Sequence, residues 1–180
     1  MSDDTVLSTS IAEPSPTAGE AEMLLFSLDR SRAQFAWKVG GLDTATLHAP
    51  HPPSAMTLGG LIKHLALVED QRTAEHLGGP GFGAVWSGWD GPEWEWRSAA
   101  DDSASQLYAL WRDAVERSRA AWTRALAEGG LDAPASSGQG TLRRVLVDLT
   151  DEYARHVGHA DLMREAIDGL VGEDPPQGDR

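Results

Sequence analysis

Apolar residues recur every three or four positions in four stretches of the chain, which is the spacing of an amphipathic helix. The stretches run from Glu20 to about Val39, from Thr57 to Leu77, from about Ser103 to Glu128 and from Thr141 to Gly169. Paired glycines follow the first three stretches and a single glycine ends the fourth, as is common at helix C-termini. Each predicted helix has one apolar face, and a four-helix bundle is the simplest all-α arrangement that buries all four faces.

The segments between and around these helices contain most of the glycine and proline. We expect residues 1–19 to form a disordered N-terminal tail, residues 20–170 the helical bundle and residues 171–180 a C-terminal tail. The proline-rich segment 42–56 contains His48 and His51, which we expect to be exposed to solvent. The connector 78–102 shows no regular pattern of its own, and loops of this length are often functional.

The last predicted helix departs from a plain apolar face. Its inward positions at helical spacing are Leu142, Val145, Leu149, Glu152, His156, His159 and Met163. Burying an unpaired carboxylate costs several kcal/mol, so Glu152 must be paired, neutralised or bound to a metal ion. Residues four apart in a helix lie one above the other, so Glu152 and His156 can reach the same ion.

A histidine also interrupts the apolar face of the second predicted helix. His64 lies on that face between Leu61 and Val68, where it is either a core histidine bonded to a neighbouring group or a metal ligand. With Glu152 and His156 it would form a set of two histidines and one carboxylate, which zinc accepts while keeping a fourth position open. Ferrous iron and nickel accept the same donors.

Several further side chains have open assignments. His159 is a fourth metal ligand, a proton shuttle beside the metal, or a polar core residue bonded to a carboxylate. His76 lies near the end of the second helix, where a cation suits the helix dipole, and we expect it at the surface. Four of the seven tryptophans lie in the connector 78–102 and either close one end of the core or line a substrate pocket: Trp86, Trp89, Trp94 and Trp96.

The composition of the chain excludes several kinds of site and several kinds of partner. Its 180 residues include no cysteine, which excludes a disulfide framework, a thiolate metal site and a cysteine nucleophile. A formal charge of −13 argues against nucleic acid and anionic membranes as partners. No secretory signal and no run of 18 apolar residues is present, so we expect a soluble, cytoplasmic protein. Arginine outnumbers lysine 13 to 2, which is typical of a GC-rich bacterial genome.

Two segments resemble the DinB-like four-helix metalloproteins: MTLGGLIKHLALVED at 56–70 and DEYARHVGHADLMREAIDG at 151–169. They are most similar to the branch that contains mycothiol-dependent maleylpyruvate isomerase and related thiol S-transferases, and the likeness covers residues 20–170. The resemblance implies an up-down-down-up bundle and a divalent metal, usually zinc, held by His64, Glu152 and His156. The chain departs from this branch at Asp148, where relatives commonly carry a histidine one turn before the glutamate.

The function that this resemblance implies is metal-dependent transfer of a thiol. The metal would bind a low-molecular-weight thiol, mycothiol or another bacterial thiol, and lower its pKa, so that the thiolate attacks an electrophilic small molecule. We expect the electrophile between the end of the bundle and the tryptophan segment. The alternatives are a thiol-independent metal hydrolase or isomerase and a non-catalytic metal-binding stress protein. Both a monomer and a homodimer fit these expectations.

Overall fold

The computed structural model describes residues 6–79 and 83–178, and these residues form helices and loops without a β-strand. Within that part of the chain the four long helices are α1 (Glu20–Val39), α3 (Leu58–His76), α5 (Ala104–Gly129) and α6 (Leu142–Asp168). They match the four predicted stretches to within one or two residues at each end. No helix among the described residues has the length and apolar character needed to cross a bilayer.

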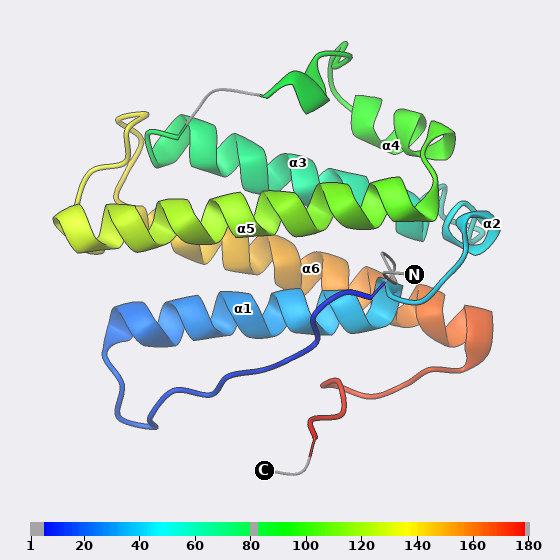
Figure 1. Cartoon of the computed structure of the whole chain (residues 1–180), viewed down its shortest axis with the longest axis horizontal. Coiled ribbons are helices and arrows are strands. Elements are labelled where there is room, and N and C mark those ends of the chain that lie inside the picture. The colour runs from blue at the N-terminus through cyan, green and yellow to red at the C-terminus, as the bar shows by residue number, and fades with distance from the viewer. Residues whose placement is uncertain (1–5, 80–82, 179–180) are drawn as a thin grey trace.

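The four long helices form an up-down-down-up bundle, which confirms the predicted architecture. Figure 1 shows that α1 and α6 run in one direction and that α3 and α5 run in the other. The most extensive contacts join α3 to α5 and α1 to α6, and α3 also packs against α6. Because α3 and α5 are parallel, the connector between them has to cross the length of the bundle (Figure 1).

The connecting segments contain short helices that the sequence pattern did not predict. The first, α2 (Thr44–Leu47), lies between α1 and α3. The connector from α3 to α5 holds η1 (Ala84–Trp86), α4 (Trp94–Ser98) and η2 (Ala99–Asp101). Both α4 and η2 pack against α3, so this connector forms a wall of the bundle.

The ends of the long helices follow their sequence signals, with one exception. The Thr57 hydroxyl accepts a hydrogen bond from the Gly60 amide at the start of α3. At the end of α6, Gly169 adopts φ = 79°, a left-handed conformation that glycine adopts without strain. Thr141 precedes α6 as predicted, but its side chain makes no capping hydrogen bond.

A buried ion pair links the helices inside the apolar core. The guanidinium of Arg32 on α1 donates to both carboxylate oxygens of Glu69 on α3, at 2.8 and 2.7 Å. The two side chains are 2% and 0% exposed. Arg32 also donates to the Ser118 hydroxyl of α5 at 3.2 Å. Burial favours a neutral Arg32, but the adjacent carboxylate outweighs it, so the pKa of Arg32 lies above its ordinary value.

His76 is buried rather than at the surface, so the prediction for this residue was wrong. The loop before α6 folds over the end of α3, where the Ser136 amide donates to the His76 carbonyl oxygen at 2.9 Å. The imidazole Nδ1 lies 2.8 Å from the Ser137 hydroxyl. This cover leaves His76 only 6% exposed. Helical periodicity describes the helix alone, so it does not predict that a distant loop will cover the end of the helix and bury His76.

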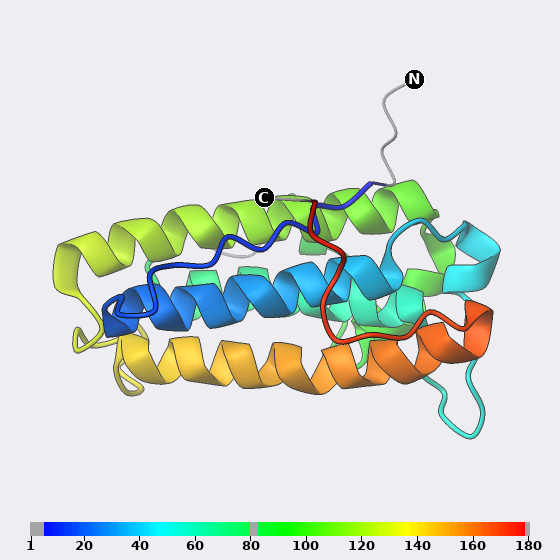
Figure 2. The ribbon, with the colours of Figure 1, turned by 90° about the horizontal axis from the view of Figure 1, so that it is seen from below.

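The described parts of the two terminal segments lie against α1, as Figure 2 shows. Leu7 is buried in the hydrophobic core. Arg30 of α1 donates to Asp174 at 3.0 Å, and Gln177 donates to the Thr9 carbonyl oxygen at 3.1 Å. The division of the chain into two tails and a bundle stays a prediction.

We expect the Glu69→Gln substitution to destabilise the fold by about 3–5 kcal/mol, because it removes the buried carboxylate that pairs with the Arg32 guanidinium and leaves only the half-exposed Asp29, at 2.9 Å, as a charged partner. Urea unfolding followed by circular dichroism measures this difference. Asp113→Asn is the matched control, since Asp113 pairs with Arg112 at half-exposed positions, where an ion pair contributes about 0–1 kcal/mol. Equal effects of the two substitutions would contradict the importance of the buried pair.

Candidate metal centre

Three side chains from two helices converge where α3 packs against α6. They are His64 of α3 and Glu152 and His156 of α6, and one ligand atom of each lies within 4.8 Å of the others. The Glu152 Oε1 atom lies 3.1 Å from His64 Nε2 and 3.2 Å from His156 Nε2. The structure thus brings together the residues that interrupt the two apolar faces, although 88 positions separate His64 from Glu152.

The burial of these side chains is graded from core to solvent. His156 is 6% exposed, whereas the side chains of His64 and Glu152 are 17% and 28% exposed. Glu152 and His156 are adjacent because four residues make about one helical turn. A site at this depth is shielded from bulk water but still reachable by a small molecule.

The geometry of the donor atoms fits a divalent cation. A tetrahedral site with ligand bonds of about 2.0–2.2 Å has donor atoms about 3.3–3.6 Å apart, close to the two distances from Glu152 Oε1. Lone pairs of imidazole and carboxylate that face each other at 3.1–3.2 Å require either a proton or a cation between them. The described part of the chain contains no other such cluster of three histidine or carboxylate side chains.

Two of the three converging side chains, His156 and Glu152, favour the protonation states that a metal needs. Burial and the nearby His64 lower the pKa of His156 to about 4, so its imidazole is neutral at pH 7. Burial pushes the pKa of Glu152 upward, but the hydrogen bond with His64 and the interactions with the two neighbouring imidazoles outweigh it and leave the pKa below its ordinary value. A neutral imidazole and a carboxylate bind metal without first losing a proton.

Helix α4 positions His64 from the side away from Glu152. The Nδ1 atom of His64 donates to Glu95 at 3.0 Å, and Glu95 is only 6% exposed. The Trp96 ring stacks on the His64 ring, with centroids 4.6 Å apart and planes inclined by 23°. A carboxylate that accepts from one imidazole nitrogen directs the other nitrogen toward a metal. Glu95 and Trp96 together fix both the tautomer and the plane of His64.

Gly60 makes this close approach of α4 possible. It precedes His64 by one helical turn, and a Cβ atom added at Gly60 would lie 2.8 Å from Trp96 Cε3. That distance is too short for a real carbon contact, so a larger residue would displace the Trp96 ring.

His159 contacts His156 on the side away from Glu152. The two Nδ1 atoms lie 3.2 Å apart, and His159 is partly exposed. His159 therefore borders the three converging side chains without joining their cluster. Its role as a proton shuttle stays a prediction.

The structure places the four predicted pocket tryptophans in different surroundings. Trp96 alone stacks on a residue of the cluster, His64. Trp94 lies 4.6 Å above the Lys63 ammonium group, and Trp86 is buried and donates to Asp70 at 2.7 Å. Trp89 is 53% exposed. Their assignment as a substrate pocket stays a prediction.

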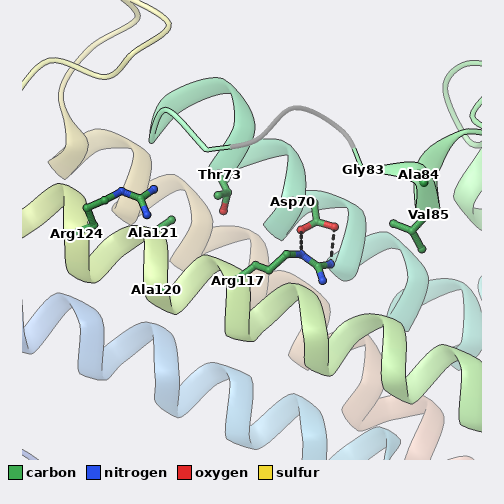
Figure 3. Close-up of a pocket in the computed structure, with 9 residues that line it drawn as sticks. All are labelled: Asp70, Thr73, Gly83, Ala84, Val85, Arg117, Ala120, Ala121 and Arg124. Carbon is green, nitrogen blue, oxygen red and sulfur yellow. Dashed lines mark hydrogen bonds and ion pairs between the residues drawn. The ribbon is translucent and has the colours of Figure 1, made fainter.

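A groove of about 440 Å³ between α3 and α5 is not part of the metal centre (Figure 3). Asp70 of α3 and Arg117 of α5 form an ion pair along its wall, and none of the three converging side chains lines it. Asp148 pairs with Arg144 at 2.7 Å and takes no part in the cluster.

Glu95 is the polar residue of this site that sequence reasoning missed. The only local signal was a carboxylate between two tryptophans, Trp94 and Trp96, in a segment without helical periodicity. Its contact with His64 depends on the packing of α4 against α3, which that segment alone does not reveal.

We expect Glu95→Gln to weaken metal binding about 10- to 100-fold and to leave the helix content unchanged, because His64 loses the carboxylate that orients it. Competition with a chromophoric zinc chelator measures the affinity. Glu93→Gln removes the same charge at an exposed position two residues earlier and is the matched control. If both variants bind zinc like the parent protein, Glu95 does not support the site.

Comparison with known proteins agrees with the geometry. The sequence model of the mycothiol-S-transferase family matches residues 23–169, a range that includes all three converging residues and extends from α1 to the end of α6. No curated protein matches the chain. Since the match covers most of the chain and describes a family of transferases, the protein belongs to the mycothiol-S-transferase family.

Proposed function

We propose that this enzyme uses a divalent metal to transfer a low-molecular-weight thiol, with mycothiol as the thiol that the family implies. The observation that carries the proposal is the convergence of His64, Glu152 and His156, whose ligand atoms lie within 4.8 Å of one another. The chain has no cysteine, so the sulfur must come from a co-substrate.

The metal that we propose is zinc, because two imidazole nitrogens and one carboxylate oxygen form a common catalytic zinc set with one open position. Iron and nickel accept the same donors. A divalent ion held by His64, Glu152 and His156 would lower the pKa of a coordinating thiol and so would supply a thiolate near neutral pH.

The residues around the ligands have separate tasks in this proposal. Glu95 and Trp96 hold His64 in one orientation, so the site needs little rearrangement when it binds metal. His159 accepts the proton that the thiol releases, since it borders both His156 and solvent. The sulfur forms a bond to an electrophilic carbon of the second substrate. Either a leaving group departs from that carbon with its electron pair, or the electron pair of a double bond moves to the adjacent atom, which then takes up a proton. We also place the enzyme in the cytoplasm, where such thiols stay reduced.

We expect His64→Ala to lose the bound metal and retain its helices. Loss of several kcal/mol of electrostatic stabilisation would then reduce thiol transfer by about 100-fold or more. Elemental analysis measures metal content, and depletion of monochlorobimane in the presence of mycothiol measures transfer.

His76→Ala is the control for this experiment, because His76 is a second buried histidine on α3 that lies outside the cluster. It should keep its metal. Unchanged metal content in His64→Ala would remove this residue from the ligand set. Turnover of esters or amides that needs metal but no thiol would favour a hydrolase instead.

A further inference from the structure

A pocket of about 370 Å³ lies beside the proposed metal centre, between the loop that precedes α3 and the C-terminal half of α6. The loop contributes residues 51–54 and Met56, and α6 contributes His159, Leu162, Met163 and Ala166. Figure 2 shows this loop next to the last turns of α6. No tryptophan of the segment that the sequence suggested lines this pocket.

The pocket adjoins the metal centre through His159. This residue lines the pocket, and its Nδ1 lies 3.2 Å from Nδ1 of the proposed ligand His156. A molecule in the pocket would therefore lie about one imidazole ring from the proposed metal, since Nδ1 of His156 faces His159 and its Nε2 faces Glu152. Met163 lies one turn beyond His159 and extends the same wall.

The lining of this pocket is suited to an uncharged ligand. Among the described residues that form it, none is an aspartate, glutamate, lysine or arginine. This is unusual in a chain with 43 such residues in 180, the sum of its 15 basic and 28 acidic residues. Leu162 lines the pocket with 70% of its surface exposed, and an apolar ligand would cover it. The wall thus favours an apolar molecule, because its polar side chains are limited to the imidazoles of His51 and His159 and the hydroxyl of Ser54.

His51 provides a polar position in this apolar lining. Contrary to the expectation of full exposure, it is only partly exposed, as is His48. Its Nε2 atom is shielded from solvent and has no hydrogen-bond partner among the described residues. Since this nitrogen is not accessible from the pocket, His51 does not offer it to a ligand, and the imidazole adds no carboxylate, ammonium or guanidinium group to the lining.

From these contacts we propose that the pocket between residues 51–56 and the last turns of α6 binds the electrophile, and that its substrates are uncharged, largely apolar molecules. This inference rests on the proposed thiol transfer for its chemistry. The binding of the electrophile is a separate property that can be measured without turnover.

Ala166→Trp tests the pocket, because Ala166 is exposed at the pocket edge and an indole there fills the space without disturbing the core. We expect kcat/KM for monochlorobimane to fall about tenfold or more, since loss of a buried apolar contact has that size. The small electrophile iodoacetamide should react at nearly the parent rate, and metal content and the KM of mycothiol should not change. Ala154→Trp places the same side chain on an exposed face of α6 outside the pocket and should match the parent.

Binding of the unreactive syn-dimethylbimane, followed by fluorescence polarisation, separates this inference from the proposed function. Weaker binding to Ala166→Trp than to Ala154→Trp supports the pocket even if the parent protein transfers no thiol. Equal binding to both variants overturns the pocket, whether or not the protein is a transferase. An equal loss of activity with both electrophiles also overturns it, because the substitution would then act on the thiol or the metal.

Discussion

The packing of α3 against α6 is the constraint on which this structure depends. It brings a histidine and a glutamate that are far apart in the sequence to a separation of 3.1 Å, at a depth where neither can be fully hydrated. Polar groups in such a place are costly unless they share a proton or a cation. The bundle therefore tolerates polar residues on the apolar faces of α3 and α6 only because these residues contact one another.

The connector between α3 and α5 supplies the side chains that support the candidate site formed by α3 and α6. Because these two helices are parallel, the chain must return along the bundle, and α4 lies on that return path (Figure 1). Its Glu95 and Trp96 constrain the same imidazole, one through a hydrogen bond and the other through stacking. The topology of the bundle thus provides the support for the site, and the absence of a side chain at Gly60 lets that support come close.

The sequence predicted the parts of the structure that local periodicity controls. The four helices and the polar positions at Glu152, His156 and His64 follow from a repeat of three to four residues. Periodicity identifies which face of a helix is buried, but it does not identify which groups of other elements pack against that face. The Arg32–Glu69 pair and the contact of Glu95 with His64 are tertiary contacts between separate elements, and for this reason they were not anticipated.

The central claim is that His64, Glu152 and His156 bind a metal ion that in turn binds a thiol. X-ray absorption spectroscopy of the purified protein, recorded at the absorption edge of the bound metal, tests this claim most directly. The account predicts a first shell of nitrogen and oxygen with the scattering pattern of two imidazoles and no sulfur, because the chain has no cysteine. Addition of mycothiol should then introduce one sulfur neighbour at about 2.3 Å. The proposed metal site would be contradicted if the protein purified without metal. It would also be contradicted if the coordination shell of the metal lacked imidazole and gained no sulfur when mycothiol was added.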